Sequence, residues 1–270
     1  MAMQLDVSGL SVRVGNRDIL RDLSFSLPGG ELICVLGRNA CGKTTLMKCL
    51  AGLQSHAGVV RLTEDHKELS SSAISYLPQL THVTSRLTVF EMVMLGLGAH
   101  LSWRVQSEVF DRVDTTLHAM QINALADRPV YALSGGQKQL VFMAQSFVSR
   151  PRLLLLDEPT SALDLRHQLI VMDAARHYAQ ETGAVVLAVV HDLQLAARFA
   201  SRLMLLAEGR VQRLGTPKEV LTREEIRSAY AVEATVEALS SGHLVVAPER
   251  PVTLSGHTHT NGEHHHSHAL

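Results

Sequence analysis

Residues 37–44 read Gly37-Arg38-Asn39-Ala40-Cys41-Gly42-Lys43-Thr44, which fits the pattern G-x-x-x-x-G-K-[ST]. An apolar run precedes them, and the helix-like stretch Thr45–Leu50 follows, which is the context that a phosphate-binding loop requires. The glycines let backbone N–H groups surround a phosphate, while Lys43 is expected to neutralise the β- and γ-phosphates and Thr44 to bind Mg²⁺. A glycine-rich turn that merely caps a helix is the alternative, and the flanking strand and helix disfavour it.

A second candidate site segment is the apolar run Leu153–Leu156, which ends in Asp157 and Glu158. Chemistry in α/β proteins is usually placed at the carboxyl ends of strands. We expect Asp157 to hold Mg²⁺ through water and Glu158 to accept a proton from an attacking water. Simple N-capping of a helix by these acids is the alternative, and the phosphate loop upstream weighs against it.

Short apolar runs alternate with helix-like segments, which predicts an α/β fold with a mostly parallel sheet. The four clearest strands are Glu31–Leu36, Ile74–Leu77, Leu153–Asp157 and Ala184–Val190. Residues 4–14 and 17–27 alternate on either side of Gly15-Asn16, so they predict an antiparallel pair at the edge of that sheet.

The chain between the two site segments changes character, because apolar residues recur there at helical spacing. Thr88 and Glu91 form a candidate capping box at its start. We expect one domain over residues 1–250, with an inserted helical subdomain over about 85–150 and two further helices starting near Thr216 and Thr222. Residues 251–270 lose apolar periodicity and gather histidines, so a disordered tail is expected.

Composition excludes several classes of function. With 25 Lys and Arg against 26 Asp and Glu, the net charge is -1, so nucleic acid is not an expected partner. The longest apolar run, residues 184–190, is far shorter than the roughly 20 residues that span a membrane. The first ten residues carry neither a charged leader nor a long apolar stretch, so we expect no secretory signal and a cytosolic location.

The segment Leu133-Ser134-Gly135-Gly136-Gln137 makes the sequence resemble the ATP-binding cassette (ABC) ATPases. Gln79 after one strand, Ser161-Ala162-Leu163-Asp164 just past Glu158, and His191 after another strand follow the order of that family's motifs. The similarity covers about residues 4–220. It implies a P-loop NTPase core and an ATP hydrolase that uses ATP and Mg²⁺.

The resemblance also implies a role for each motif. Glu158, His191 and Gln79 would be catalytic, with His191 sensing the γ-phosphate, and the metal would be held by Thr44, Gln79 and Asp157. Two chains would sandwich two ATP molecules head to tail, with the serine-glycine turn of one chain closing on the phosphate loop of the other. The nucleotide-binding residues would be Gly37, Arg38, Asn39, Ala40, Cys41, Gly42, Lys43, Thr44, Thr45, Ser134, Gly135, Gly136, Gln137 and Asp164.

The sequence departs from the family pattern at two positions. Val14 stands where many relatives stack adenine on an aromatic side chain, so base binding would rest on apolar contact. Asn39-Ala40-Cys41 lacks the glycine that more usually follows the Asn, which places a Cβ and the Cys41 thiol in the loop. The place of Cys41 before a helix would allow either a thiol with a depressed pKa or an inert small residue.

Weaker similarities concern the particular transporter class. Residues 87–96 and the extension 223–246 resemble the cassettes of importers for iron-siderophore, haem and cobalamin. This resemblance implies membrane permease partners, an indirectly coupled substrate-binding protein and a peripheral position on the cytoplasmic side of the inner membrane. Two alternatives remain, namely an importer of a bare metal ion such as zinc or manganese and a soluble assembly ATPase. Six histidines within 257–268 would suit a metal-linked substrate, and solvated low-complexity sequence without a function is the alternative.

Overall fold

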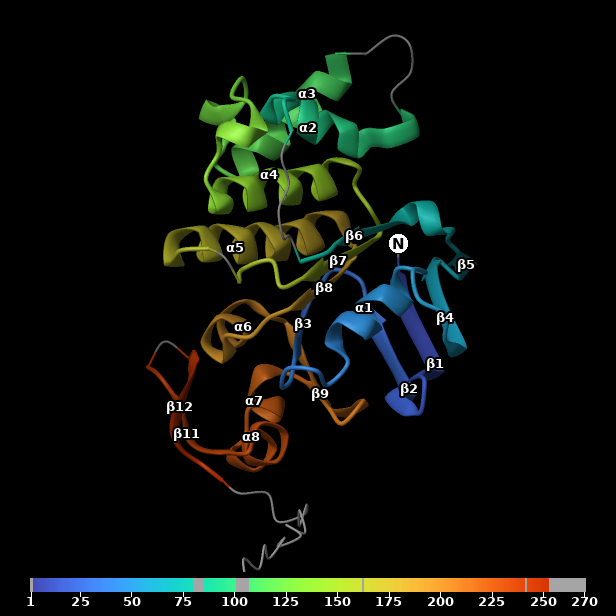
Figure 1. Ribbon diagram of the computed structural model, residues 1–270, viewed down its shortest axis with the longest axis vertical. Coiled ribbons are helices and arrows are strands. Elements are labelled where there is room, and N and C mark those ends of the chain that lie inside the picture. Colours follow the sequence, from blue (N-terminus) through green and yellow to red (C-terminus); the bar gives the residue numbers. More distant parts are fainter. Residues whose placement is uncertain (1, 80–84, 101–106, 162, 241, 253–270) are drawn as a thin grey trace, which may run out of the picture.

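A six-stranded sheet forms the centre of the computed structural model, which describes residues 2–79, 85–100, 107–161, 163–240 and 242–252 (Figure 1). The strands lie in the order β10-β9-β3-β8-β7-β6. Only β10 runs antiparallel to its neighbour. The strands are β3 (Leu32–Leu36), β6 (Ile74–Leu77), β7 (Leu153–Asp157), β8 (Val185–Val189), β9 (Arg202–Ala207) and β10 (Arg210–Gly215).

The four strands expected from apolar runs are confirmed as β3, β6, β7 and β8, within one residue at each end. Every residue of β3, β7 and β8 is buried. This burial follows from their composition, because a strand covered on both faces needs apolar side chains at consecutive positions rather than at alternate ones. The sequence pattern therefore identified the core of the sheet.

The predicted antiparallel pair forms as β1 (Met3–Val14) and β2 (Arg17–Pro28), but its strands are not members of the parallel sheet. It belongs to a second, four-stranded sheet in the order β2-β1-β4-β5, with β4 (Ala57–Glu64) and β5 (Lys67–Glu68). The antiparallel edge of the parallel sheet is β10, which pairs with β9 after a tight turn at Glu208 and Gly209. The choice of pairing partner is a tertiary effect that alternation within a strand does not encode.

Helices cover the two faces of the central sheet unequally. Helix α1 (Lys43–Leu50) packs with β1, β2 and one face of the central strands into one apolar cluster. Helices α4 (Gly135–Val148), α5 (Leu165–Thr182) and α6 (Leu193–Phe199) contribute to a second cluster on the other face. Alternate residues of β3 divide accordingly, with Ile33 and Val35 in the first cluster and Cys34 in the second.

The described residues between β6 and β7 are mainly helical. They contain α2 (Val89–Met94), α3 (Ser107–Ala119), α4 and 3-10 turns at Leu95–His100, Asn123–Leu125 and Val130–Ala132. The predicted capping box is confirmed, because Thr88 Oγ1 accepts from Glu91 N at 3.2 Å and Thr88 N donates to Glu91 Oε2 at 2.8 Å. Helices α2 and α3 lie beyond α4, away from the sheet (Figure 1). One further 3-10 turn, Ser71–Ala73, precedes β6.

The C-terminal elements are α7 (Pro217–Val220), α8 (Arg223–Tyr230) and a hairpin of β11 (Val232–Ala238) and β12 (Leu244–Pro251). The two helices begin at Thr216 and Thr222 as expected. Within the described ranges, no helix combines the length and apolar character needed to cross a bilayer. Residues 253–270, with the histidines singled out above, lie outside the described part of the chain.

Candidate nucleotide-binding and hydrolysis site

The phosphate loop leaves the carboxyl end of β3 and enters α1. Gly37 has φ 145° and Gly42 has φ 107°, conformations that side chains rarely adopt. A Cβ atom at Gly37 would lie 2.2 Å from the backbone oxygen of Leu206, and one at Gly42 would lie 2.6 Å from Leu20 Cδ2. The fold as well as the backbone conformation therefore requires glycine at position 37, whereas at position 42 the positive φ is the main requirement.

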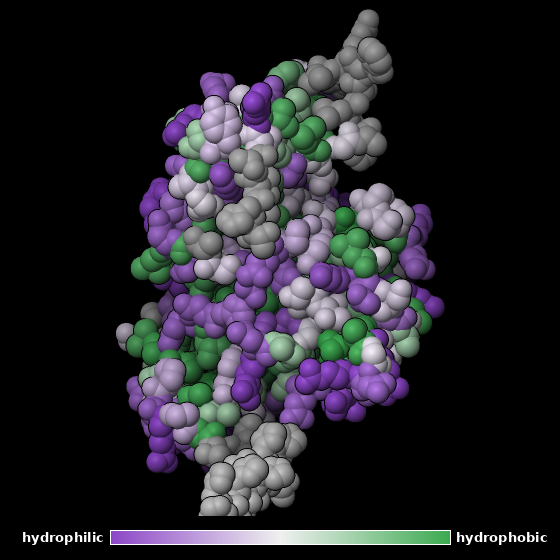
Figure 2. Space-filling model, in the orientation of Figure 1, coloured by the Kyte–Doolittle hydropathy of each residue, from purple (hydrophilic) through white to green (hydrophobic). Residues whose placement is uncertain are grey.

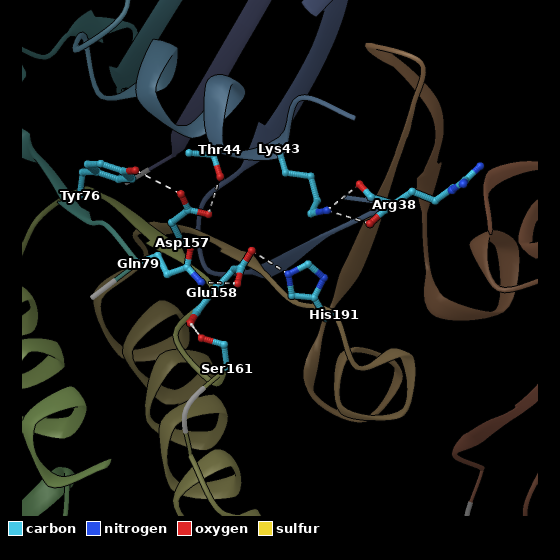
Figure 3. A network of polar contacts seen from close by, with 10 residues as sticks. Arg38, Lys43, Thr44, Tyr76, Gln79, Asp157, Glu158, Ser161 and His191 are labelled. Carbon is cyan, nitrogen blue, oxygen red and sulfur yellow. Dashed lines mark hydrogen bonds and ion pairs between the residues drawn. The ribbon is translucent and has the colours of Figure 1, made fainter. Parts of the chain in front are cut away.

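Lys43 turns its ammonium group back into this loop. Its Nζ donates to the carbonyl oxygens of Gly37 and Arg38 at 2.8 and 2.9 Å (Figure 3). The residue is only 5% exposed, and among the described residues it forms no ion pair with a carboxylate. Neutral carbonyl groups do not cancel the charge of a buried ammonium group, so Lys43 can attract and bind an anionic ligand.

Asp157 ends β7 next to Thr44. Thr44 Oγ1 donates to Asp157 Oδ1 at 3.3 Å, and the hydroxyl of Tyr76 on β6 donates to Asp157 Oδ2 at 3.2 Å. Burial raises the pKa of Asp157, while the Thr44 and Tyr76 hydrogen bonds oppose that rise. Burial, and then the negative charge of Asp157, raises the pKa of Tyr76. The sequence analysis did not identify Tyr76. Its position in β6, the strand directly beside β7, could have indicated a contact with Asp157.

Glu158 lies between two of the predicted partners. Gln79 Nε2 donates to Glu158 Oε2 at 2.9 Å, and His191 Nε2 lies 2.7 Å from Glu158 Oε1 (Figure 3). Gln79 follows β6, Glu158 follows β7 and His191 follows β8, so three neighbouring parallel strands present one residue each at the same edge. Glu158 itself has φ 53°, a left-handed backbone conformation that is energetically unfavourable for a residue other than glycine.

The loop and the acid share one cavity of about 330 Å³. It is lined by Ile19, Asn39, Ala40, Gly42, Lys43, Thr44, Thr45 and Glu158. Arg38 and Cys41 line a neighbouring cavity between the loop, β9–β10 and α8. Burial raises the pKa of the half-buried Cys41 thiol, against a smaller opposing effect of Lys43, so the depressed pKa considered for this residue is wrong in direction. Val14, at the end of β1, is 59% exposed.

The structure does not bring the remaining predicted residues into this cavity. Ser134 caps α4, because its Oγ accepts from Gln137 N at 3.3 Å while Gln137 Oε1 accepts from Ser134 N at 3.1 Å. Gly135 and Gly136 form the first turn of the same helix. Asp164 caps α5 by accepting from His167 N at 2.9 Å, and this hydrogen bond is the main reason that its pKa is lowered. Within the described chain, none of these residues hydrogen-bonds to the phosphate loop.

The fold and this cavity define a phosphate-loop nucleoside triphosphatase. Residues 20–161 match the family model described as ABC transporter. The chain belongs to this family, and it is an ATP-binding protein and an ATP hydrolase.

Similar proteins extend over nearly the whole chain. It is 36% identical over 250 residues to the hemin import ATP-binding protein HmuV of Plesiomonas shigelloides, covering 84% of this chain and 94% of that one. It is also 36% identical over 240 residues to the iron(3+)-hydroxamate import ATP-binding protein FhuC of Bacillus subtilis, covering 86% and 89%. A solved metal-chelate type ABC transporter in an inward-facing conformation matches with a TM-score of 0.77 at 27% identity, covering 90% of this chain and 97% of that one.

Proposed function

We propose that this chain is the ATP-hydrolysing subunit of an ABC importer for a chelated metal, namely an iron-siderophore, haem or cobalamin. The observation that carries the hydrolytic part is the position of Glu158, between Gln79 and His191 and beside the phosphate loop. The transported class is supported by the relatives, two of which are named for the import of hemin and iron(3+)-hydroxamate. An importer of a bare zinc or manganese ion is the second candidate.

The residues present fit MgATP. A Cβ at Gly37 would overlap Leu206 O and displace the loop, and the buried Lys43 ammonium lacks a carboxylate partner among the described residues, which favours a polyphosphate. Thr44 and Asp157 offer hard oxygen donors side by side, the ligand type that Mg²⁺ prefers, and Gln79 adds an amide. When bound, the metal ion would neutralise charge on the β- and γ-phosphate oxygens.

Glu158 is the proposed general base. Its carboxylate is held by Gln79 on one oxygen and by His191 on the other, so its orientation is fixed before substrate arrives. In this proposal Glu158 takes the proton of the attacking water, His191 contacts the γ-phosphate and Gln79 reports nucleotide state to the helical region. Lys43 holds the β- and γ-phosphates through hydrogen bonds in place of those to its own loop.

Two copies of the chain are proposed to form the complete site. Ser134–Gln137 open α4, which packs on the face of the central sheet opposite to α1 and the phosphate loop. The serine-glycine turn is a second anion-binding helix start, so it would serve the nucleotide of a partner chain. In a head-to-tail pair, each ATP would contact one phosphate loop and one serine-glycine turn, with Asp164 near the junction.

The helical subdomain, about residues 85–150, is the proposed docking region for a permease at the cytoplasmic face of the inner membrane. Large apolar side chains are exposed there, with Tyr131 at 55%, Leu95 at 50% and Phe110 at 48%. In Figure 2 hydrophobic side chains lie beside hydrophilic ones at the top of the molecule, where α2 and α3 are, whereas hydrophilic ones cross the middle of the same face. A substrate-binding protein would act through that permease.

Glu158→Gln tests the hydrolytic proposal directly. The variant should bind MgATP, lose turnover and accumulate a dimer with two ATP molecules, which size-exclusion chromatography and nucleotide quantification measure. Lys43→Ala should instead lose nucleotide binding. Hydrolysis at the parental rate by Glu158→Gln, or unchanged ATP affinity in Lys43→Ala, would contradict the assigned roles.

Transport assays test the substrate class. Cells lacking this chain should fail to take up labelled hemin, ferric hydroxamate or cobalamin and should recover on complementation with the parental gene but not with Glu158→Gln. Loss of zinc or manganese uptake alone would instead identify the second candidate. Normal uptake of all of them, together with co-purification of soluble partners only, would indicate an assembly ATPase.

A further inference from the structure

The turn that carries Glu158 is held in an unfavourable conformation. Glu158 has φ 53°, and the chain turns directly through Pro159, Thr160 and Ser161 toward α5. Non-glycine residues in the left-handed region persist only where the surrounding structure fixes them. The groups that fix this turn therefore also determine where the Glu158 carboxylate points.

Three successive carbonyl oxygens of the turn each accept a hydrogen bond from a side chain. Ser161 Oγ donates to Glu158 O at 3.1 Å, Gln139 Nε2 donates to Pro159 O at 3.2 Å, and Gln168 Nε2 donates to Thr160 O at 3.3 Å. The first contact is local. The two glutamines come from different helices, Gln139 from α4 and Gln168 from α5.

Gln139 is buried, with 6% of its surface exposed. The other buried polar or charged side chains among the described residues are Lys43, Asp157 and Thr160. Lys43 belongs to the phosphate loop, Asp157 to β7 and Thr160 to this turn. Burying an amide is unfavourable unless it is hydrogen-bonded. The other buried residues of α4, such as Leu140 and Val141, are all apolar, so the amide at this position is explained by its bond to Pro159 O.

Gln139 also lies one helical turn after Gly135, at which α4 begins. The same short stretch of helix therefore carries the serine-glycine turn at its start and the donor to the Glu158 turn. A shift of α4 along its axis would move both together, because a hydrogen bond of this length tolerates little displacement.

We infer that Gln139 is a positioning residue that couples the start of α4 to the orientation of Glu158, with Gln168 fixing the same turn from α5. The inference rests on the proposed function, in which Glu158 is the general base and Ser134 contacts the nucleotide of a partner chain. It assigns to Gln139 no contact with substrate.

Gln139→Met tests this assignment, because methionine keeps the length and flexibility of the side chain but cannot donate to Pro159 O. With the full chain, we expect kcat for ATP hydrolysis to fall roughly tenfold, with KM and the Kd for MgATP unchanged. Gln145→Met is the matched control, since Gln145 lies on the same helix, is half-buried and points to Met92 Sδ at 3.6 Å instead. The control should keep the parental kcat.

Each outcome bears on the inference. An unchanged kcat in Gln139→Met, or changes confined to KM and the thermal unfolding midpoint, would overturn it. If Gln139→Met does not fold, Gln168→Met removes the donor to the next carbonyl oxygen and should lower kcat with KM unchanged; an unchanged kcat there would also overturn the inference. Parental hydrolysis by Glu158→Gln would instead refute the proposed function on which it rests.

Discussion

Gly37 illustrates how closely single residues are constrained at the loop. Alanine there would have to adopt a positive φ and would also press its Cβ against Leu206 O. Gly30 provides the comparison, because it has φ 81° but a Cβ atom there would meet nothing within 4 Å. Comparing an alanine substitution at Gly30 with one at Gly37 therefore separates the effect of backbone strain from the effect of steric overlap.

We therefore expect Gly37→Ala to lose MgATP affinity by at least about tenfold, or about 1.4 kcal/mol. Gly30→Ala should cost about 1 kcal/mol of unfolding free energy from its backbone conformation alone, with MgATP affinity unchanged. Equilibrium nucleotide binding and urea denaturation measure the two effects. Equal MgATP affinity in both variants would show that the loop tolerates the overlap.

Asp157 is a second residue whose effect can be measured, because burial of its carboxylate lowers the stability of the folded protein. Because burial raises its pKa in the folded chain, folding disfavours the charged carboxylate, and the free energy of unfolding falls as pH rises through the native pKa. Asp157→Asn removes this titration and still offers an oxygen to Thr44 or Tyr76. Its effect should thus depend on pH.

In nucleotide-free thermal unfolding from about pH 4 to pH 8, Asp157→Asn should gain stability over the parental chain as pH rises. The midpoint should shift by about 2–4 °C for each kcal/mol recovered. MgATP hydrolysis should fall in the same variant. A pH-independent difference between the two chains would argue against a buried carboxylate as its cause.

At the scale of elements, α2 and α4 are two of the described helices that begin with a capping box, and they do so in different contexts. Thr88 caps α2 and Ser134 caps α4, each with a glutamate or glutamine side chain returning to the cap backbone. Loss of a cap hydroxyl costs about 1 kcal/mol of stability. The structural contribution of the two hydroxyls is therefore similar.

Thr88→Ala and Ser134→Ala should both lower the unfolding free energy by about 1 kcal/mol, measured in urea. Only Ser134→Ala should also lower ATP hydrolysis, because Ser134 alone is proposed to reach a partner's nucleotide. Equal hydrolysis by the two variants would limit Ser134 to its capping role.

The elements also show what the sequence could predict. β3, β7 and β8 were predictable because burial on both faces demands uninterrupted apolar runs. β4 was missed because its residues are mostly exposed or half-buried and show no clear alternation. The membership of β1 and β2 in a second sheet depends on β4 and was missed with it.

The site could be predicted to the extent that its residues occupy strand ends. Gln79, Glu158 and His191 follow three apolar strands, and only the strand order, β6 beside β7 beside β8, was needed to bring them together. Tyr76, Gln139 and Gln168 were missed because each hydrogen bond joins two different elements, and the pairing of those elements is set by the tertiary fold. Periodicity identifies buried faces but does not assign polar partners across them.

At the scale of the whole molecule, nucleotide binding should increase the free energy of unfolding. A ligand that binds only the folded state adds about 2.7 kcal/mol at a hundredfold excess over its Kd. If two chains share two ATP molecules, this stabilisation also depends on protein concentration.

MgATP should therefore raise the unfolding midpoint of Glu158→Gln, and the rise should grow with protein concentration in differential scanning calorimetry. The added change Ser134→Ala should remove the concentration dependence and leave a smaller, constant rise. A rise independent of concentration in Glu158→Gln would indicate that each chain binds nucleotide alone.

The separation of the two apolar clusters by the central sheet has a consequence for motion. Amides of β3, β7 and β8 are covered from both faces, so they should be the last to exchange with deuterium, on the timescale of global unfolding. Gln194 Nε2 on α6 donates a hydrogen bond to Val246 O of the β11–β12 hairpin at 2.7 Å. The amides of this hairpin should exchange far sooner than those of the central strands. We therefore expect the sheet edge that carries Gln79, Glu158 and His191 to lie in the slowest-exchanging part of the protein, and the β11–β12 hairpin to open independently of it.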